Sequence, residues 1–315
     1  MDSNTHHGHN SPETESPPLV SNRTARVIDT KDSIEATEDH SMALAPWFMA
    51  ALSLPYRDPG ADLLAWERVN GSTRITITPY VRDGEALYPF GIYPRLLLTW
   101  MTTEAIKTGS DEIQIADGLR AFMRQIGTTQ GGRQKKAMLD QMQRLFNAHI
   151  RIETVEEIDR DGEPLTHVVT KNFQVTEEHE LWLKDAESVE WGSTVTLSPK
   201  FYESLVSHSF PVYAEALRAI GNSAFCLDIY LFLVSRLYRL KKRTRISWAQ
   251  LNEQFGGRYT EIKAFKRDFV KHLKTVQIIY PEAKVEVESK CLVLLPSKQH
   301  VPSKEAAGAI TATTG

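Results

Sequence analysis

The sequence has only two cysteines, no long hydrophobic run and none of the common catalytic motifs. Cys226 and Cys291 occur without a CxxC or Cys/His spacing that would suit a metal ion, and such sparse usage is typical of a reducing compartment. The longest apolar stretch, residues 42–54, is too short to cross a bilayer. Residues 1–41 contain no apolar core of a signal peptide. We therefore expect a soluble, cytoplasmic protein.

Enzyme signatures are missing as well. No GxxxxGKS/T, HExxH, GxSxG or GxGxxG motif occurs. His7-Gly8-His9 is not the His-hydrophobe-His metal site of rolling-circle initiators, and a short flexible His cluster is more often incidental than metal-binding. Tyr230 and Tyr238 lie in an apolar segment, where a core role is simpler than a nucleophilic one. We expect no catalysis, no cofactor and no metal site.

Charge is nearly balanced overall but unevenly distributed. The formal net charge is −3, and residues 1–40 hold eight acids against three Lys/Arg. Between residues 231 and 275 the balance reverses, with twelve Lys/Arg against three acids. Because Lys and Arg bind DNA by neutralising phosphates and releasing counterions, a local excess of this size indicates a nucleic-acid surface confined to a patch. A merely solvated basic face is the ordinary alternative.

The basic region begins with an apolar helix and a helical turn motif. Ser223 is a suitable cap for a buried helix that runs to Tyr238. After the basic run, residues 244–246 are expected to be extended. Ser247 and Gln250 then form a capping box that opens a helix over 248–255, which Gly256 and Gly257 end.

A longer helix follows, over residues 261–278, with Thr260 as its expected cap. At a helical period, Ile262, Phe265, Phe269, Leu273 and Val276 share one apolar face. Basic residues gather roughly opposite: Lys263, Lys266, Arg267, Lys271 and Lys274. Segments 284–287 and 291–295 then predict a β-hairpin. Helix, short strand, helix, turn, helix and hairpin is the order of a winged helix-turn-helix.

The first half of the chain repeats this order. The pattern predicts a strand over 72–81, a helix over 89–107, a short extended piece at 111–115, a helix over 118–126 capped by Asp117, a helix over 133–149, and strands at 150–157 and 165–174. The loop 127–132 (GTTQGG) either offers amides to a phosphate or is a plain turn, which is the simpler interpretation.

These patterns predict an α+β protein with two tandem winged-helix domains and disordered tails at both ends. The predicted divisions are a disordered acidic tail over 1–41, an N-terminal winged-helix domain over 42–208, a C-terminal winged-helix DNA-binding domain over 209–297 and a second disordered tail over 298–315. The likeness between the halves is one of pattern, since their sequences differ.

Several segments, in one order, resemble a known family. These are Ala45-Pro46, residues 54–56 (LPY), 93–100 (YPRLLLTW), 103–105 (TEA), 131–133 (GGR), 141–146 (QMQRLF), 197–199 (LSP), 201–202 (FY), 224–231 (AFCLDIYL), 246–248 (ISW), 265–269 (FKRDF) and 280–285 (YPEAKV). Together they resemble the plasmid-encoded RepA family of replication initiators, over roughly residues 45–296.

The resemblance implies a protein that binds double-stranded DNA at repeated sites in a plasmid origin. It also implies self-association as a dimer, repression of the protein's own promoter, and contact with the host initiator and replicative helicase. The N-terminal domain would add DNA backbone contacts and the dimer surface.

The expected DNA-binding residues are basic side chains in both domains. In the C-terminal domain they are Arg243, Arg245, Arg258, Lys263, Lys266, Arg267, Lys271 and Lys274, and in the N-terminal domain Arg133, Lys135 and Lys136. Arg267 is the first choice for a base contact, because Arg can bind guanine with two hydrogen bonds. Two alternatives stay open: a winged-helix transcriptional repressor without initiation activity, and an origin nickase or primase-like enzyme.

Overall fold

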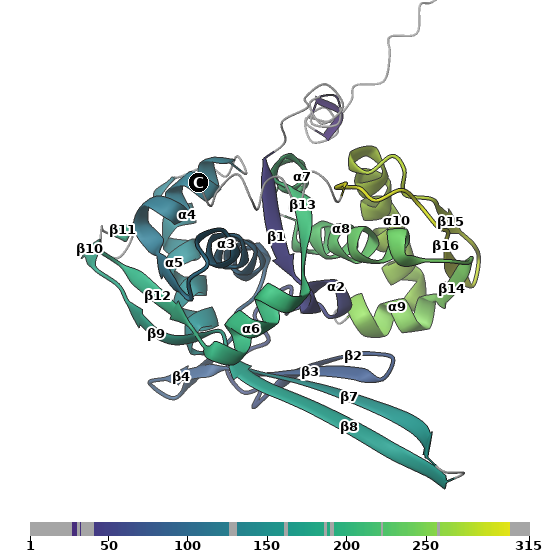
Figure 1. Ribbon diagram of the computed structural model, residues 1–315, viewed down its shortest axis with the longest axis horizontal. Coiled ribbons are helices and arrows are strands. Elements are labelled where there is room, and N and C mark those ends of the chain that lie inside the picture. Colours follow the sequence, from purple (N-terminus) through teal and green to yellow (C-terminus); the bar gives the residue numbers. More distant parts are fainter. Residues whose placement is uncertain are drawn as a thin grey trace, which may run out of the picture.

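The computed structural model (Figure 1) describes residues 27–29, 32, 41–125, 131–160, 163–185, 188–189, 192–221, 223–256 and 259–302. Most of the two predicted tails, four of the six residues of the 127–132 loop and Arg258 lie outside these residues. The described chain mixes helices with antiparallel strand pairs, which confirms the α+β class. None of its described helices has the length and apolar character needed to span a bilayer.

A four-stranded antiparallel sheet forms the lower layer in Figure 1. Its order is β2 (Trp66–Asn70), β3 (Thr73–Thr78), β7 (His149–Arg160) and β8 (Glu163–Gln174). Isoleucines at alternate positions of β3 and β7 are buried against the helices above, as strand periodicity requires. The predicted strand 72–81 is interrupted after β3, because Pro79 has no N–H to continue the ladder, and resumes as β4 (Tyr80–Arg82).

Helices α3 (Ile92–Thr108), α4 (Ile115–Gln125) and α5 (Gly132–Asn147) lie above the sheet (Figure 1). α3 is buried on almost every side, which explains its continuous apolar sequence. Asp117 is not a cap as predicted, since α4 begins two residues earlier and Asp117 lies in its first turn.

The strand between α3 and α4 pairs differently from the winged-helix expectation. β6 (Glu112–Gln114) joins β12 (Thr194–Leu197) and β9 (Thr176–Glu180) in a separate sheet with β12 at its centre. It does not pair with the β7–β8 hairpin, which instead extends the four-stranded sheet outward. The distal half of that hairpin therefore projects from the body as an arm (Figure 1).

Two small hairpins, three short helices and one further strand pair complete the described chain up to residue 221. The hairpins are β4 with β5 (Glu85–Leu87), and β10 (Leu183–Asp185) with β11 (Ser188–Val189). The helices are α2 (Phe48–Ala51), α6 (Pro199–His208) and α7 (Ala214–Ile220). β1 (Met42–Pro46) pairs with β13 (Ser209–Tyr213), and Pro211, a candidate boundary residue by sequence, sits in this pairing opposite Leu44. The pairing crosses the predicted 208/209 division.

The C-terminal elements follow the predicted order closely. α8 (Ala224–Arg236) is capped by the Ser223 side chain and continues as a short 3-10 turn, η1 (Leu237–Arg239). β14 (Thr244–Ser247) leads into α9 (Trp248–Phe255), whose Ser247/Gln250 capping box is confirmed. α10 (Ile262–Ile279) follows, and the predicted hairpin is β15 (Val285–Val287) and β16 (Cys291–Leu294). β14 pairs with β16, so the three strands form one sheet.

Two details of α10 differ from the prediction. The residue at its N-cap position is Glu261 rather than Thr260, and no side chain caps the helix. Ile262, assigned to the apolar face, is 46% exposed because it lies in the first turn, beyond the reach of the core. Phe265, Phe269 and Leu273 are buried as predicted.

The beginning of the predicted C-terminal tail is part of the core. His300 and Val301 are buried. The His300 ring stacks on Tyr280 with 4.5 Å between ring centroids, and its Nδ1 lies 3.0 Å from the Tyr230 hydroxyl. The Tyr280 hydroxyl donates a hydrogen bond to the Lys298 carbonyl. The sequence did not predict the burial of His300, because a single ring in a polar segment produces no periodic pattern.

A buried ion pair joins the two halves of the chain. Arg95 of α3 donates from Nε and Nη2 to the two carboxylate oxygens of Asp228 on α8, at 2.7 and 2.8 Å. The remaining guanidinium hydrogens reach the carbonyls of Leu54, Pro55 and Gly91. Burial raises the pKa of Asp228, and the Arg95 charge opposes that rise. The donors of the Arg95 guanidinium all have acceptors, so this pair fixes how α3 lies against α8.

Removing one residue of the Arg95–Asp228 pair should strongly destabilise the fold. In Asp228→Ala the Arg95 guanidinium stays buried without its anion, and we expect the free energy of unfolding to fall by about 3–5 kcal/mol. Replacing both residues, as Arg95→Met with Asp228→Leu, should recover much of that loss because no unpaired charge remains. Urea unfolding measures both effects.

The matched control is the exposed pair of Arg74 and Glu67 in the sheet. Arg74→Ala should cost less than about 1 kcal/mol, because solvent screens this pair. Equal losses for Arg74→Ala and Asp228→Ala would contradict the structural role given to the buried pair.

Candidate nucleic-acid interface

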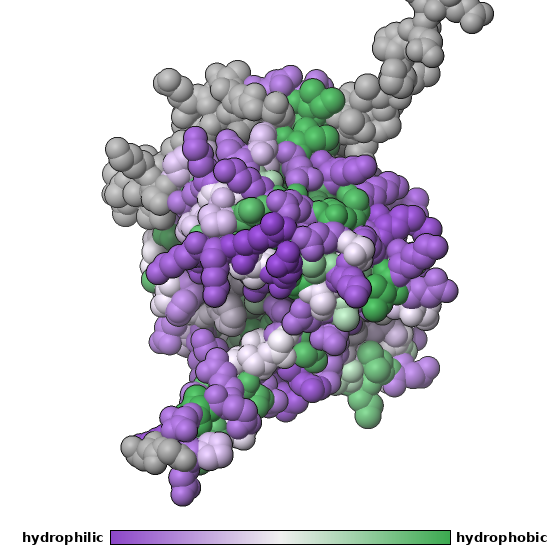
Figure 2. All heavy atoms as spheres, turned by 90° about the vertical axis from the view of Figure 1, so that its right-hand side faces the viewer, coloured by the Kyte–Doolittle hydropathy of each residue, from purple (hydrophilic) through white to green (hydrophobic). Residues whose placement is uncertain are grey.

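The exposed face of α10 presents a stripe of four cations. Lys263, Arg267, Lys271 and Lys274 are all exposed and follow one another at intervals of four, four and three residues, which places them along one side of the helix. Within the described residues the three lysines have no ion-pair partner, and Arg267 only approaches the neighbouring Asp268, at 4.0 Å. Figure 2 shows that the molecular face on this side is largely hydrophilic. These cations are available to an anionic partner.

Lys266 does not belong to this stripe, contrary to the prediction. Its Nζ donates to the carbonyls of Glu288 and Ser289, at 2.8 and 3.1 Å, and lies 5.0 Å from the centre of the Trp248 ring. At ~100° per residue, Lys266 is only about 70° from the middle of the buried face, while Arg267 is about 170° away. Lys266 therefore connects α10 to the turn between β15 and β16.

Two of the predicted arginines are paired within the C-terminal sheet. Arg243 donates to Glu286 and Glu288, at 2.7 and 2.8 Å, and Arg245 lies 3.5 Å from Glu288. A hydrogen bond from the Cys291 thiol and the nearby arginines lower the pKa of Glu288, so this carboxylate stays ionised beside them. The carboxylates of the β15–β16 hairpin and its turn thus neutralise much of the positive charge of Arg243 and Arg245.

The N-terminal candidates form a separate group. Arg133, Lys135 and Lys136 are exposed in the first turns of α5. α5 and α10 lie on opposite sides of the molecule, so the structure does not bring the two basic groups together (Figure 1). Cations are unfavourable at the positive end of a helix, and a bound phosphate would relieve this repulsion.

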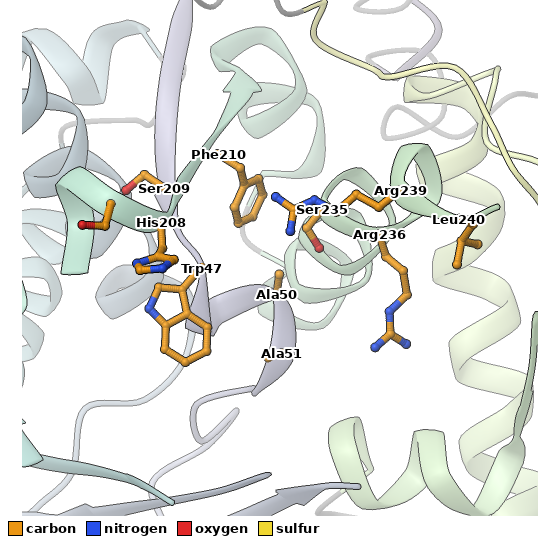
Figure 3. Close-up of a pocket in the computed structure, with 11 residues that line it drawn as sticks. Trp47, Ala50, Ala51, His208, Ser209, Phe210, Ser235, Arg236, Arg239 and Leu240 are labelled. Carbon is orange, nitrogen blue, oxygen red and sulfur yellow. The ribbon is translucent and has the colours of Figure 1, made fainter. Parts of the chain in front are cut away.

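Two further arginines, Arg236 and Arg239, line a groove between the two halves. They belong to the basic region of the sequence but were not predicted to bind DNA. The groove has a volume of about 510 Å³ and is lined by Trp47, Ala50, Ala51, Ser207, His208, Ser209, Phe210, Ser235, Arg236, Arg239 and Leu240. Figure 3 shows Arg236 and Arg239 on the wall formed by α8 and η1, facing Trp47 and His208 across the groove.

The electrostatics of this groove favour an anion. Among the described residues, no Asp or Glu lines it. Burial lowers the pKa of Arg236, whose guanidinium lies 4.8 Å from the Phe232 ring and forms no ion pair within the described residues. A partly buried cation without an anion is costly, and a phosphate oxygen would offset that cost. The helical period of the sequence predicted the α10 stripe. The sequence could not predict this groove, because it forms only through the tertiary packing of α2, α6 and α8.

No group of three or more His, Cys, Asp or Glu residues in the described part of the chain is arranged to hold a metal ion. Tyr230 is buried, as expected, and burial raises the pKa of its hydroxyl well above the ordinary value. The His6–His9 segment lies outside the described residues.

Comparison with known proteins places this α+β chain in a family. A family model described as plasmid encoded RepA protein matches residues 88–250, which is more than half of the 315 residues. The chain belongs to this family of plasmid-encoded RepA proteins. Membership supports a role in the initiation of plasmid replication.

Two solved structures show the same overall fold. A crystal structure of selenomethionine derivatives of domains 2 and 3 of RctB has a TM-score of 0.52 and 12% identity, covering 78% of this chain and 95% of that one. A second structure of RctB domains 2–3 has a TM-score of 0.50 and 12% identity, covering 81% and 97%. No curated protein matches the sequence. At this identity the likeness shows the fold alone.

Lys266 and Arg267 make different contacts, so their substitutions should differ in their effect on stability. Lys266→Met should lower the free energy of unfolding by about 1–2 kcal/mol, because two hydrogen bonds from a charged donor are lost. Arg267→Met should change it by less than about 0.5 kcal/mol, since its side chain is exposed. Chemical denaturation compares the two, and hydrogen exchange of residues 285–294 reports whether the hairpin loosens. Equal stability of both variants would contradict the assignment.

Proposed function

We propose that this chain initiates plasmid replication by binding repeated double-stranded sites in the origin, with α10 as the recognition helix. The observation that supports this most strongly is the stripe of Lys263, Arg267, Lys271 and Lys274, which is exposed and almost free of acidic partners. Such a stripe, on the helix that follows the turn, suits insertion into the major groove. Arg267 is the proposed base contact and the lysines bind phosphates.

Both halves act as winged-helix domains in this proposal. In the C-terminal half, the pairing of β14 with the β15–β16 hairpin supports a wing beside α10. In the N-terminal half, β9 and β12 are the proposed wing, because they rather than β7 and β8 share a sheet with β6. Arg133, Lys135 and Lys136 add contacts to the DNA backbone, as do Arg236 and Arg239 in the groove.

The protein works in the cytoplasm, self-associates as a dimer, represses its own promoter in that form, and contacts the host initiator and replicative helicase. It is not an enzyme. Incubation with supercoiled origin DNA and Mg²⁺ should leave the DNA intact, and a site-specific nick would overturn this part.

A salt series tests the DNA-binding proposal. Binding to DNA that flanks the gene is measured against random competitor, and about six neutralised phosphates give a log–log salt slope near −5. Lys263→Ala with Lys271→Ala should reduce that slope by about 2, because two phosphate contacts are lost. Arg267→Ala should instead lower the preference for the specific site by about 1–3 kcal/mol.

Lys107→Ala is the matched control, since Lys107 is an exposed cation at the end of α3. It should leave both the slope and the preference unchanged. If the control weakens binding as much as the α10 variants do, the contribution of α10 is only general charge, and the recognition role is wrong.

A further inference from the structure

The arm formed by the distal halves of β7 and β8 has no role in the proposed DNA contacts. The β7–β8 hairpin as a whole, residues 149–174, contains six acids against three Lys/Arg. This negative charge makes the arm unsuited to a phosphate backbone. It nevertheless exposes apolar side chains: Val155, Ile158, Leu165, Val168 and Val169 are between 38% and 52% exposed. Figure 2 shows hydrophobic residues among hydrophilic ones along this projection. Such a surface is typical of a protein–protein contact.

The outer edge of β8 is open except at its last residue, Gln174, whose carbonyl accepts a hydrogen bond from the Ser198 hydroxyl. β8 is the last strand of its sheet, and no described strand pairs with its far side. The strand is twelve residues long and its central residues, Thr166 to Thr170, include four β-branched side chains. An exposed edge of this length is a ready template for another strand.

The register within the sheet determines which β8 residues point their backbone groups outward. The N–H of Val155 donates to Ser72 on the β3 side, so odd-numbered residues of β7 bond toward β3 and even-numbered ones toward β8. Even-numbered β7 residues oppose odd-numbered β8 residues. The outward groups of β8 therefore belong to Thr166, Val168, Thr170 and Asn172, and to Pro164, which has no N–H to donate.

We propose that β8 pairs antiparallel with β8 of a second copy of this chain, around a twofold axis at His167. This inference rests on the dimerisation included in the proposed function, and it names the surface through which the two copies pair. Thr166 of each copy then exchanges backbone hydrogen bonds with Val168 of the other. The two four-stranded sheets become one sheet of eight strands. A twofold axis requires the same strand to complement itself, and β8 does so.

Side-chain complementarity selects this register. Residues 163, 165, 167, 169 and 171 lie on one face of the ribbon. With His167 opposite its own copy, Glu163 faces Lys171 at both ends and Leu165 faces Val169 twice. These are the pairs without backbone hydrogen bonds, whose Cα atoms approach to about 4.5 Å, so opposite charges and apolar groups meet closely.

Lys171 has one competing contact in the single chain. Its Nζ lies 5.3 Å from the centre of the Trp47 ring. Lys171 is exposed and its side chain is long, so exchanging this contact for Glu163 of the second copy has a small cost.

Charge reversal tests the register. The oligomeric state of the full chain without DNA is measured by sedimentation over a concentration series. Glu163→Lys and Lys171→Glu should each weaken dimerisation about tenfold, because two like-charge pairs replace two attractive ones. The double variant should restore dimerisation, and an equimolar mixture of the two single variants should form heterodimers. Glu157→Lys, on the other face of the arm, is the matched control and should leave dimerisation unchanged.

A cysteine at the axis provides a second readout. His167→Cys should form a disulfide-linked dimer under mild oxidation, whereas Val155→Cys, on the inner strand, should not. A wild-type chain that stays monomeric at every concentration would overturn the proposal, and so would a dimer that charge reversal leaves intact. Origin binding by Glu163→Lys is measured separately, at a concentration at which this variant is monomeric, so loss of the arm contact and loss of DNA recognition are distinguishable.

Discussion

The contact on which the arrangement of this molecule depends is the buried pair of Arg95 and Asp228. α3 is the central helix of the first half and α8 is that of the second, and the guanidinium also binds the carbonyls of Leu54, Pro55 and Gly91. Around this pair, Gln254 of α9 donates to the carbonyls of Ala50 and Ala51. α9, the helix before the turn, is therefore held against the first half. Any DNA site that contacts both halves must match this fixed geometry.

The distribution of charge follows from which cations the fold itself uses. Lys266, Arg243 and Arg245 bind carbonyls and carboxylates around the β15–β16 hairpin. Lys263, Arg267, Lys271 and Lys274 remain on the solvent side of α10. The first group stabilises the position of the hairpin, and the second is available to phosphates and bases. Basic residues that look alike in the sequence thus differ in whether the fold itself uses them.

Local signals predicted the C-terminal half well. The capping box at Ser247, the helical period of Phe265, Phe269 and Leu273, and the hairpin are interactions between residues close in sequence, so the sequence reveals them directly. Lys266 could have been separated from the stripe by the same helical geometry. The pairing of β6 with β12, the β1–β13 ladder and the burial of His300 join distant segments, and no local pattern specifies them. The groove with Arg236 was missed for the same reason.

The central claim is that the exposed face of α10 contacts the bases of a repeated origin site. Site-specific photocrosslinking measures this directly: a crosslinking amino acid replaces Arg267 in one protein and Lys107 in another, and the attached nucleotides are mapped on origin DNA. The account predicts crosslinks from position 267 to major-groove positions that recur in every repeat, and none from position 107. Specific binding without any crosslink from position 267 would contradict it.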